Sequence, residues 1–155
     1  MSVVSGLGQV RRTVAYVLAG AVALLSTGCS PGPGADDAVG AARAFFAAVS
    51  AHDAEGACAL LAPATRESFE QDAVSPCEQA LLDGEVGLVL APVTQRVEEA
   101  DGRGDSSVTV AGRQAQVLLG GEVTFLAASG GTWLVTATAC VARPERPYDC
   151  LLEGD

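Results

Sequence analysis

The chain beyond residue 92 carries the pattern that most constrains its fold. Apolar and polar side chains alternate there in short segments, and glycine-rich turns separate the segments. Alternation with a period of two predicts β-strands that bury one face. The predicted strands are residues 93–99, 107–111, 114–119, 122–128 and 132–140. Tight turns between consecutive strands predict an antiparallel meander.

Three of these strands would share one buried face. Its predicted members are Ala115, Val117 and Leu119, then Val123, Phe125 and Ala127, then Trp133, Val135 and Ala137. A sheet that buries one face needs a second layer to cover it. The residues before the strands are the source of that layer.

Helices are predicted for the part of the chain that precedes the strands. Residues 36–50 are rich in alanine and have apolar side chains at helical spacing. Asp53 suits the N-cap of a second helix over residues 54–61. Helices followed by a curved antiparallel sheet place the chain in the α+β class.

A third helix is predicted to begin at a capping box. Ser75 would be the N-cap, Pro76 the first helical residue and Glu78 the third. The helix would end at Gly84. The tail from residue 143 onward has two prolines before residue 148 and no clear period, so it predicts no regular element.

The first 28 residues have the layout of a secretory signal. Arg11 and Arg12 precede an apolar stretch that ends in small residues before Cys29. The stretch is shorter than the roughly 20 apolar residues that cross a bilayer. We therefore expect a leader over residues 1–28; a permanent membrane-spanning helix is the alternative.

The residues that end at Cys29 resemble the lipobox of bacterial lipoproteins. Ser26 departs from that motif, which prefers leucine there, and Leu25 lies one position earlier. The resemblance implies acylation of Cys29, with chains such as palmitate, and a lipid anchor on the extracytoplasmic face of the cell membrane. Residues 29–35 would then be a lipidated cysteine with a Pro/Gly tether, and residues 36–155 a single domain. An unmodified thiol is the alternative.

Charge excludes two classes of partner. All 19 acidic residues follow residue 28, and the formal charge of the whole chain is −10. Such a surface repels nucleic acid and anionic headgroups. All the basic residues are arginine, and with 18 glycines this is typical of a high-GC genome such as that of an actinobacterium.

Four cysteines remain after Cys29 and form an even set, which favours disulfides in an exported protein. Four cysteines allow three pairings. We predict Cys58–Cys77 and Cys140–Cys150, because each pair is local and closes a loop in a separate half of the domain. A metal site is the alternative, but His52 is the one histidine and has no cysteine at a usual zinc spacing.

The order of elements, with a "GGTW" turn into a late strand, is similar to the nuclear transport factor two-like superfamily. It is closer still to small secreted actinobacterial lipoproteins with that cone-shaped domain. The resemblance implies a sheet curled around an apolar pocket. Its lining would come from Phe45 or Phe46, Val117, Phe125 and Trp133. The alternative is that these side chains fill a closed core.

No catalytic motif or cofactor signature accompanies this pattern. We expect a non-catalytic module, on the membrane through Cys29, that binds a small apolar ligand or another envelope protein. An enzyme of the polyketide cyclase or ketosteroid isomerase type is one alternative and requires a buried acid with a perturbed pKa. A structural envelope protein, or a homodimer formed through the sheet face, is another.

Overall fold

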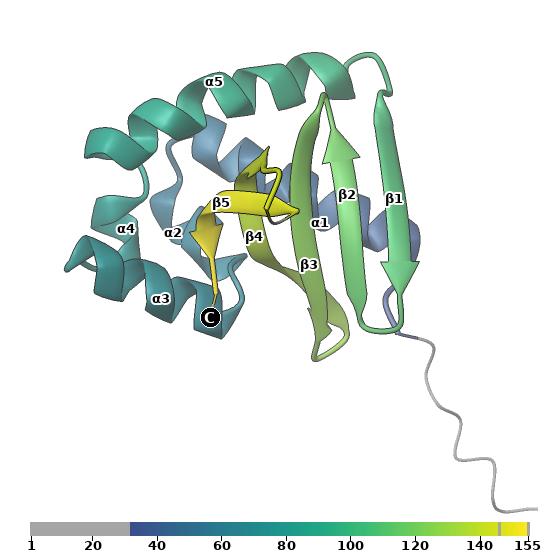
Figure 1. Ribbon diagram of the computed structural model, residues 1–155, viewed down its shortest axis with the longest axis horizontal. Helices are drawn as coiled ribbons and strands as arrows, with labels where there is room; N and C mark the ends of the chain where they lie inside the picture. Colours follow the sequence, from purple (N-terminus) through teal and green to yellow (C-terminus); the bar gives the residue numbers. More distant parts are fainter. Residues whose placement is uncertain (1–31, 146, 155) are drawn as a thin grey trace, which may run out of the picture. The chain divides into compact units, whose positions relative to one another are not determined.

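The computed structural model describes residues 32–145 and 147–154. The predicted leader, Cys29 and the start of the tether lie outside these residues. Within the compact unit Pro31–Asp155, helices precede strands along the chain (Figure 1). The helices are α1 (Ala35–Ser50), α2 (Ala54–Ala59), α3 (Pro63–Ala73), α4 (Cys77–Ala80) and α5 (Gly84–Asp101). The strands are β1 (Ser106–Ala111), β2 (Gln114–Leu119), β3 (Glu122–Ser129), β4 (Thr132–Ala142) and β5 (Tyr148–Glu153).

The five strands form one antiparallel sheet in the order β1-β2-β3-β4-β5. Each strand pairs with its neighbour in the sequence, which confirms the predicted meander (Figure 1). A register shift between Phe125 and Leu126 interrupts the pairing of β3 with β4. The α+β class is therefore confirmed, and so are both predicted disulfides, Cys58–Cys77 and Cys140–Cys150.

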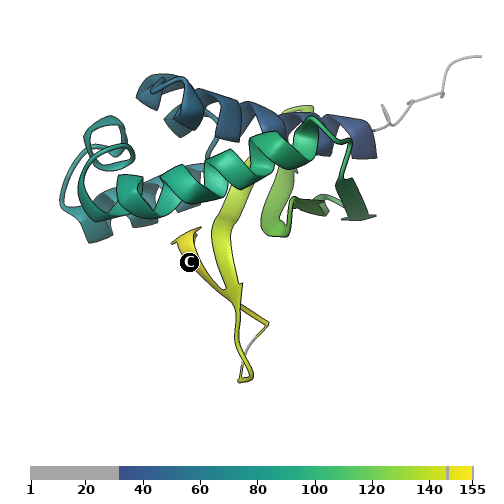
Figure 2. The ribbon, with the colours of Figure 1, turned by 90° about the horizontal axis from the view of Figure 1, so that it is seen from above.

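Helices α1 and α5 lie side by side and cover one face of the sheet (Figure 2). The core forms between them and the strands, and Phe45, Phe46 and Trp133 are among its largest fully buried side chains. Trp133 also donates its indole N–H to the carbonyl oxygen of Gly34, across 2.9 Å. This bond fixes the start of α1 against β4. Both disulfides and the whole described core lie within this one unit, which we therefore take as the folding unit.

The predicted strand over residues 93–99 is wrong, because these residues belong to α5. Val93 and Val97 are both buried and lie one helical turn apart. Pro92 lies inside the helix, where it removes a hydrogen bond to the carbonyl of Leu88. Leu88 is 77% exposed, so water can reach this part of the helix and satisfy the freed carbonyl.

The expectation of an irregular tail is also wrong. Residues 148–153 form β5, which pairs with β4 along its length. Cys140 and Cys150 are direct partners in this pairing. Pro144 and Pro147 fall in the connection before β5, so neither proline interrupts the strand.

The predicted buried face is wrong for β3. Cross-strand partners share a face, and the partners are Val117 with Thr124 and Gln116 with Phe125. Phe125 therefore lies on the face of the sheet opposite to Val117. Its ring packs edge-on against Tyr148, with 5.3 Å between centroids. The register shift similarly removes Ala137 from the helix-covered face, because Ala137 pairs with Phe125.

Polar side chains occupy the helix-covered face of β3 instead. The hydroxyls of Thr124 and Thr138 form a hydrogen bond of 2.9 Å, and both residues are buried. Glu122, only 4% exposed, accepts a hydrogen bond from the backbone N–H of Cys140. These pairings explain how polar residues can lie inside while apolar ones lie outside.

One glycine is required where the β2–β3 hairpin meets α5. Gly120 has a φ of +57°, a conformation that costs side-chain-bearing residues energy. A Cβ at this position would lie 2.7 Å from the carbonyl oxygen of Arg96 and 2.7 Å from the Cβ of Ala100. The hairpin therefore approaches the helix more closely than any other residue type would allow.

Candidate functional site

A cleft lies between the C-terminal end of α1 and one side of α5. Its volume is about 520 Å³, within the range of small-molecule sites. Apolar side chains form part of the lining, and a few polar groups converge on it. The lining residues are Val49, Ser50, His52, Leu82, Gly87, Ala91, Pro92, Thr94, Gln95 and Glu98.

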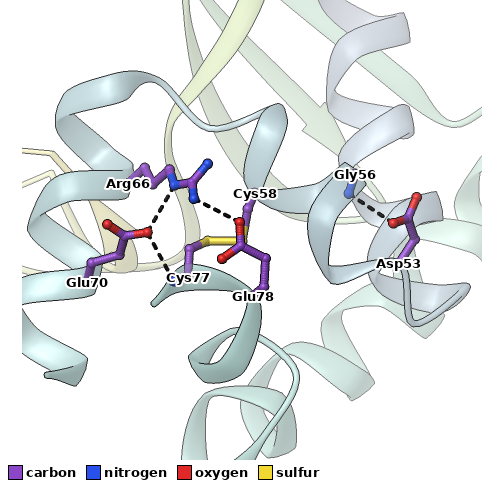
Figure 3. Close-up of a disulfide and its surroundings, with 7 residues drawn as sticks. All are labelled: Asp53, Gly56, Cys58, Arg66, Glu70, Cys77 and Glu78. Atoms are coloured by element: carbon purple, nitrogen blue, oxygen red, sulfur yellow. Dashed lines mark hydrogen bonds and ion pairs between the residues drawn. A yellow bond between two sulfur atoms is a disulfide. The ribbon is translucent and has the colours of Figure 1, made fainter. Parts of the chain in front are cut away.

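The edge of the cleft at α1 is shaped by a sharp reversal of the chain. Helix α1 ends at Ser50, and His52 adopts a φ of 56°, an uncommon backbone conformation for histidine. The ring Nδ1 of His52 lies 3.2 Å from the carbonyl oxygen of Ser50. Asp53 then accepts a hydrogen bond from the N–H of Gly56, across 2.9 Å (Figure 3), which confirms its predicted role as an N-cap. Together these bonds hold the imidazole at the rim.

Thr94 belongs to the cleft lining, and its hydroxyl oxygen is buried. The residue is 4% exposed, and its Oγ1 has no hydrogen-bond partner among the described residues. A buried hydroxyl without a partner costs about 1–3 kcal/mol. Thr94 therefore has bonding capacity that the folded chain leaves unused.

Glu98 supplies the only carboxylate of the cleft lining as the described residues define it. Its carboxylate forms no ion pair or hydrogen bond within residues 32–145 and 147–154. Glu98 also borders a second hollow of about 330 Å³ farther along α1 and α5. There Arg43 pairs with Asp101 at 2.6 Å, so that arginine already has a counter-charge.

The Cys58–Cys77 disulfide lies close to the cleft residues in the sequence, and Figure 3 shows its surroundings. It joins α2, which follows His52, to α4, which precedes Leu82. Arg66 lies beside the disulfide and contacts Glu70 at 3.0 Å and Glu78 at 2.8 Å. The disulfide thus links the two short helices that adjoin the lining residues His52 and Leu82.

The predicted capping box does not form at α4. Pro76 is the N-cap, and Glu78 pairs with Arg66 instead of reaching back to the helix start. Glu70 of α3 accepts the hydrogen bond from the N–H of Cys77, at 3.0 Å (Figure 3). The hydrogen bond from Arg66 and then that from Cys77 lower the pKa of Glu70. Glu70, seven residues before Cys77, therefore replaces Ser75 as the cap.

Among the described residues, those predicted to line an interior pocket are placed apart and do not share a hollow. Phe46, Val117 and Trp133 are fully buried members of the core. Phe125 lies on the other face of the sheet, against Tyr148. Phe46 and Trp133 each border a separate surface hollow. The cleft residues His52, Thr94 and Glu98 were not predicted as a group, since residues 93–99 were read as a strand.

Glu122 is a buried acid on the helix-covered face of the sheet. Burial raises the pKa of Glu122, while N–H groups of Cys140 and Ala139 and the charge of Arg96 act to lower it. Ala139 has a φ of 54°, so the carboxylate binds the backbone at a bend in β4. The carboxylate of Glu122 already accepts hydrogen bonds from the backbone of β4, and this residue is not part of the cleft lining.

Within the described ranges, no three His, Cys, Asp or Glu side chains are placed to hold a metal ion. No helix among the same residues is both long and apolar enough to span a bilayer. Comparison with protein-family models, with curated proteins and with solved structures found no match to this chain.

Proposed function

We propose that this protein is a lipid-anchored, extracytoplasmic binding module whose ligand site is the cleft between α1 and α5. The observation that carries the proposal is a cleft of about 520 Å³ that presents His52 and Glu98, with the buried hydroxyl of Thr94 behind its lining; among the described residues, neither the Glu98 carboxylate nor that hydroxyl has a partner. Buried polar groups in folded proteins nearly always have partners. A bound molecule is a natural source of the missing partner.

Export is supported by the leader-like residues at the start of the chain and by the two disulfides of the folded domain. The leader-like residues and Cys29 suggest secretion and lipid attachment. Two disulfides that use all four remaining cysteines fit an oxidising compartment. The layered order of helices and antiparallel sheet also fits the resemblance to the nuclear transport factor two-like superfamily. The ligand site proposed here differs from that superfamily's interior pocket, because Phe46, Val117 and Trp133 fill the interior.

A second candidate function is protein binding through the uncovered face of the sheet. Leu118 is 40% exposed there, beside the half-buried pair of Phe125 and Tyr148. An apolar surface of this kind favours contact with an envelope protein or a second copy of the chain. Native mass spectrometry can separate this candidate from a ligand site in the cleft.

Native mass spectrometry of residues 31–155, exported to an oxidising compartment and kept free of detergent, tests the proposal. A reproducible adduct that leaves on denaturation, and that a Thr94→Val variant loses, supports a ligand in the cleft. A bare chain that dimerises until Leu118 is replaced by Ser contradicts it and favours the sheet face. Lipid attachment is tested in the full chain: a fatty-acid analogue should label the wild type and leave Cys29→Ser unlabelled.

A further inference from the structure

We propose that the cleft between α1 and α5 binds a small molecule with an apolar body and a protonated amine. This inference rests on the proposed function and names the ligand class for the same site. The amine lies against Glu98, and the apolar body occupies the hollows on either side of it.

The charges around the cleft favour a cation. Glu98 is its one carboxylate and has no counter-charge within the described residues. Arginine is absent from the cleft lining that these residues form. Arg43 lines the smaller hollow, where it pairs with the carboxylate of Asp101. The C-terminal end of α1 at Ser50 adds the partial negative charge of a helix terminus. An anionic ligand would lie beside the unpaired carboxylate of Glu98, and the one guanidinium that the described residues place at the site is already paired with Asp101.

The uncommitted polar atoms are suited to a donor. An ammonium group has three N–H donors and no acceptor. The carboxylate of Glu98 accepts hydrogen bonds only and has no partner among the described residues. The Oγ1 of Thr94, one helical turn earlier, has free lone pairs but is covered, so an amine reaches it only when the covering side chains move. The carbonyl oxygen of Ser50 retains a second lone pair beside its contact with His52. A protonated amine can therefore engage groups that the protein itself leaves unpaired.

The shape of the site supports an apolar body. The larger hollow, of about 520 Å³, includes Val49, Leu82 and Pro92 in its lining. The smaller one, of about 330 Å³, includes Phe46 and Val97. Glu98 borders both, so the two hollows meet at the carboxylate. A molecule with its amine at this junction can extend apolar groups into either hollow, or into both.

Three probes with one apolar body test the inference: 3-phenylpropylamine, 3-phenylpropanol and 3-phenylpropanoate. Each is titrated into ¹⁵N-labelled residues 31–155, and amide shifts report both the affinity and the location. We expect the amine to shift amides around Thr94, Gln95 and Glu98 and to bind about two- to fivefold more tightly than the alcohol, the range for one exposed ion pair. The acid should bind most weakly, and added salt should reduce the preference for the amine.

Glu98→Gln is the decisive variant, and Glu99→Gln is its matched control. Both remove one negative charge from α5, but Glu99 is outside the lining of both hollows. Glu98→Gln should abolish the preference for the amine over the alcohol, whereas Glu99→Gln should retain it. Equal loss in both variants would mean a general charge effect and would overturn the inference.

The remaining outcomes separate this inference from the proposed function. If the three probes bind in the cleft with equal affinity, the site is a ligand site but not an amine site. If none shifts the cleft amides, or if shifts appear only elsewhere, both the inference and the cleft as the ligand site are overturned.

Discussion

The backbone N–H of Cys140 donates a hydrogen bond to the buried carboxylate of Glu122 across 3.2 Å. Burial raises the pKa of Glu122, so the folded state favours its protonated form. Stability contributed by such a group is present below the ordinary pKa of about 4.5 and is lost as pH rises through the raised value. Glu122→Gln, which keeps an acceptor for Cys140, should therefore be more stable than the wild type at pH 8.

The difference should close as pH falls toward 4.5, where the wild-type carboxyl becomes protonated. Thermal unfolding of both proteins between pH 4 and pH 8 measures this. Other groups, including Glu70 with its lowered pKa, titrate in both proteins and cancel in the difference. A difference that does not change with pH would refute the assignment. Glu122→Ala, which leaves the N–H of Cys140 unpaired, should be destabilised by about 1–3 kcal/mol.

Replacement of Thr94 by valine should stabilise the ligand-free protein. The change removes a buried hydroxyl that has no partner and keeps the shape of the side chain, for a gain of about 1 kcal/mol. Thr65→Val is the matched control, because Thr65 is equally buried but donates to the carbonyl of Thr136 at 2.9 Å. Urea unfolding should show opposite signs for the two variants, and equal losses would mean that Thr94 has a partner.

Phe46 and Phe125 should respond very differently to truncation. Phe46→Ala removes a fully buried ring and should cost about 3–5 kcal/mol. Phe125→Ala removes a half-buried ring on the other face and its contact with Tyr148, and should cost about 1–2 kcal/mol. The denaturant midpoints of unfolding, with unchanged m-values, would measure the loss of stability in each of the two variants. Comparable losses would place Phe125 in the core and contradict the β3 register.

Loss of the Cys58–Cys77 disulfide should loosen the cleft. Its cysteines are 19 residues apart, and a loop of that length contributes about 3 kcal/mol in the chain-entropy account. In the variant with both cysteines replaced by alanine, amide exchange should accelerate in α2, in α4 and at Leu81, whose N–H donates to the carbonyl of Cys77. The corresponding variant of Cys140–Cys150 should accelerate exchange in β4 and β5 instead. Unchanged protection at Leu81 in the first variant would show that the bridge does not hold the segment that leads to Leu82 and the cleft.

The sequence was sufficient where one local rule acted alone. Alternation and glycine turns located β2, β3 and most of β4, and Asp53 was recognised as a cap. The local pairing of cysteines was also correct. In each case the prediction needed only the pattern within one segment or the spacing of the cysteines along the chain.

The failures all depend on contacts between different helices and strands, which local sequence patterns do not report. The face of β3 was reversed because Thr124 and Glu122 find their partners on β4. Ser75 did not become a cap because Glu70 of α3 reaches Cys77 first. The strand predicted at residues 93–99 proved helical, because Val93 and Val97, one helical turn apart on α5, both pack into the core. With that helix unrecognised, the cleft and its Glu98 could not be anticipated.

The bond between Trp133 and Gly34 also limits how far the cleft can stand from a membrane. Gly34 is five residues after Cys29, about 17 Å of fully extended chain. Helix α1 adds 16 residues, or about 24 Å, before the rim at Ser50. With Cys29 acylated as proposed, α1 is a rigid spacer between the lipid anchor and the cleft. The hydrogen bond from the indole of Trp133 fixes the start of this helix. The cleft would then sample only a layer about 40 Å deep above the anchoring leaflet, so its ligands must pass through that layer to be captured.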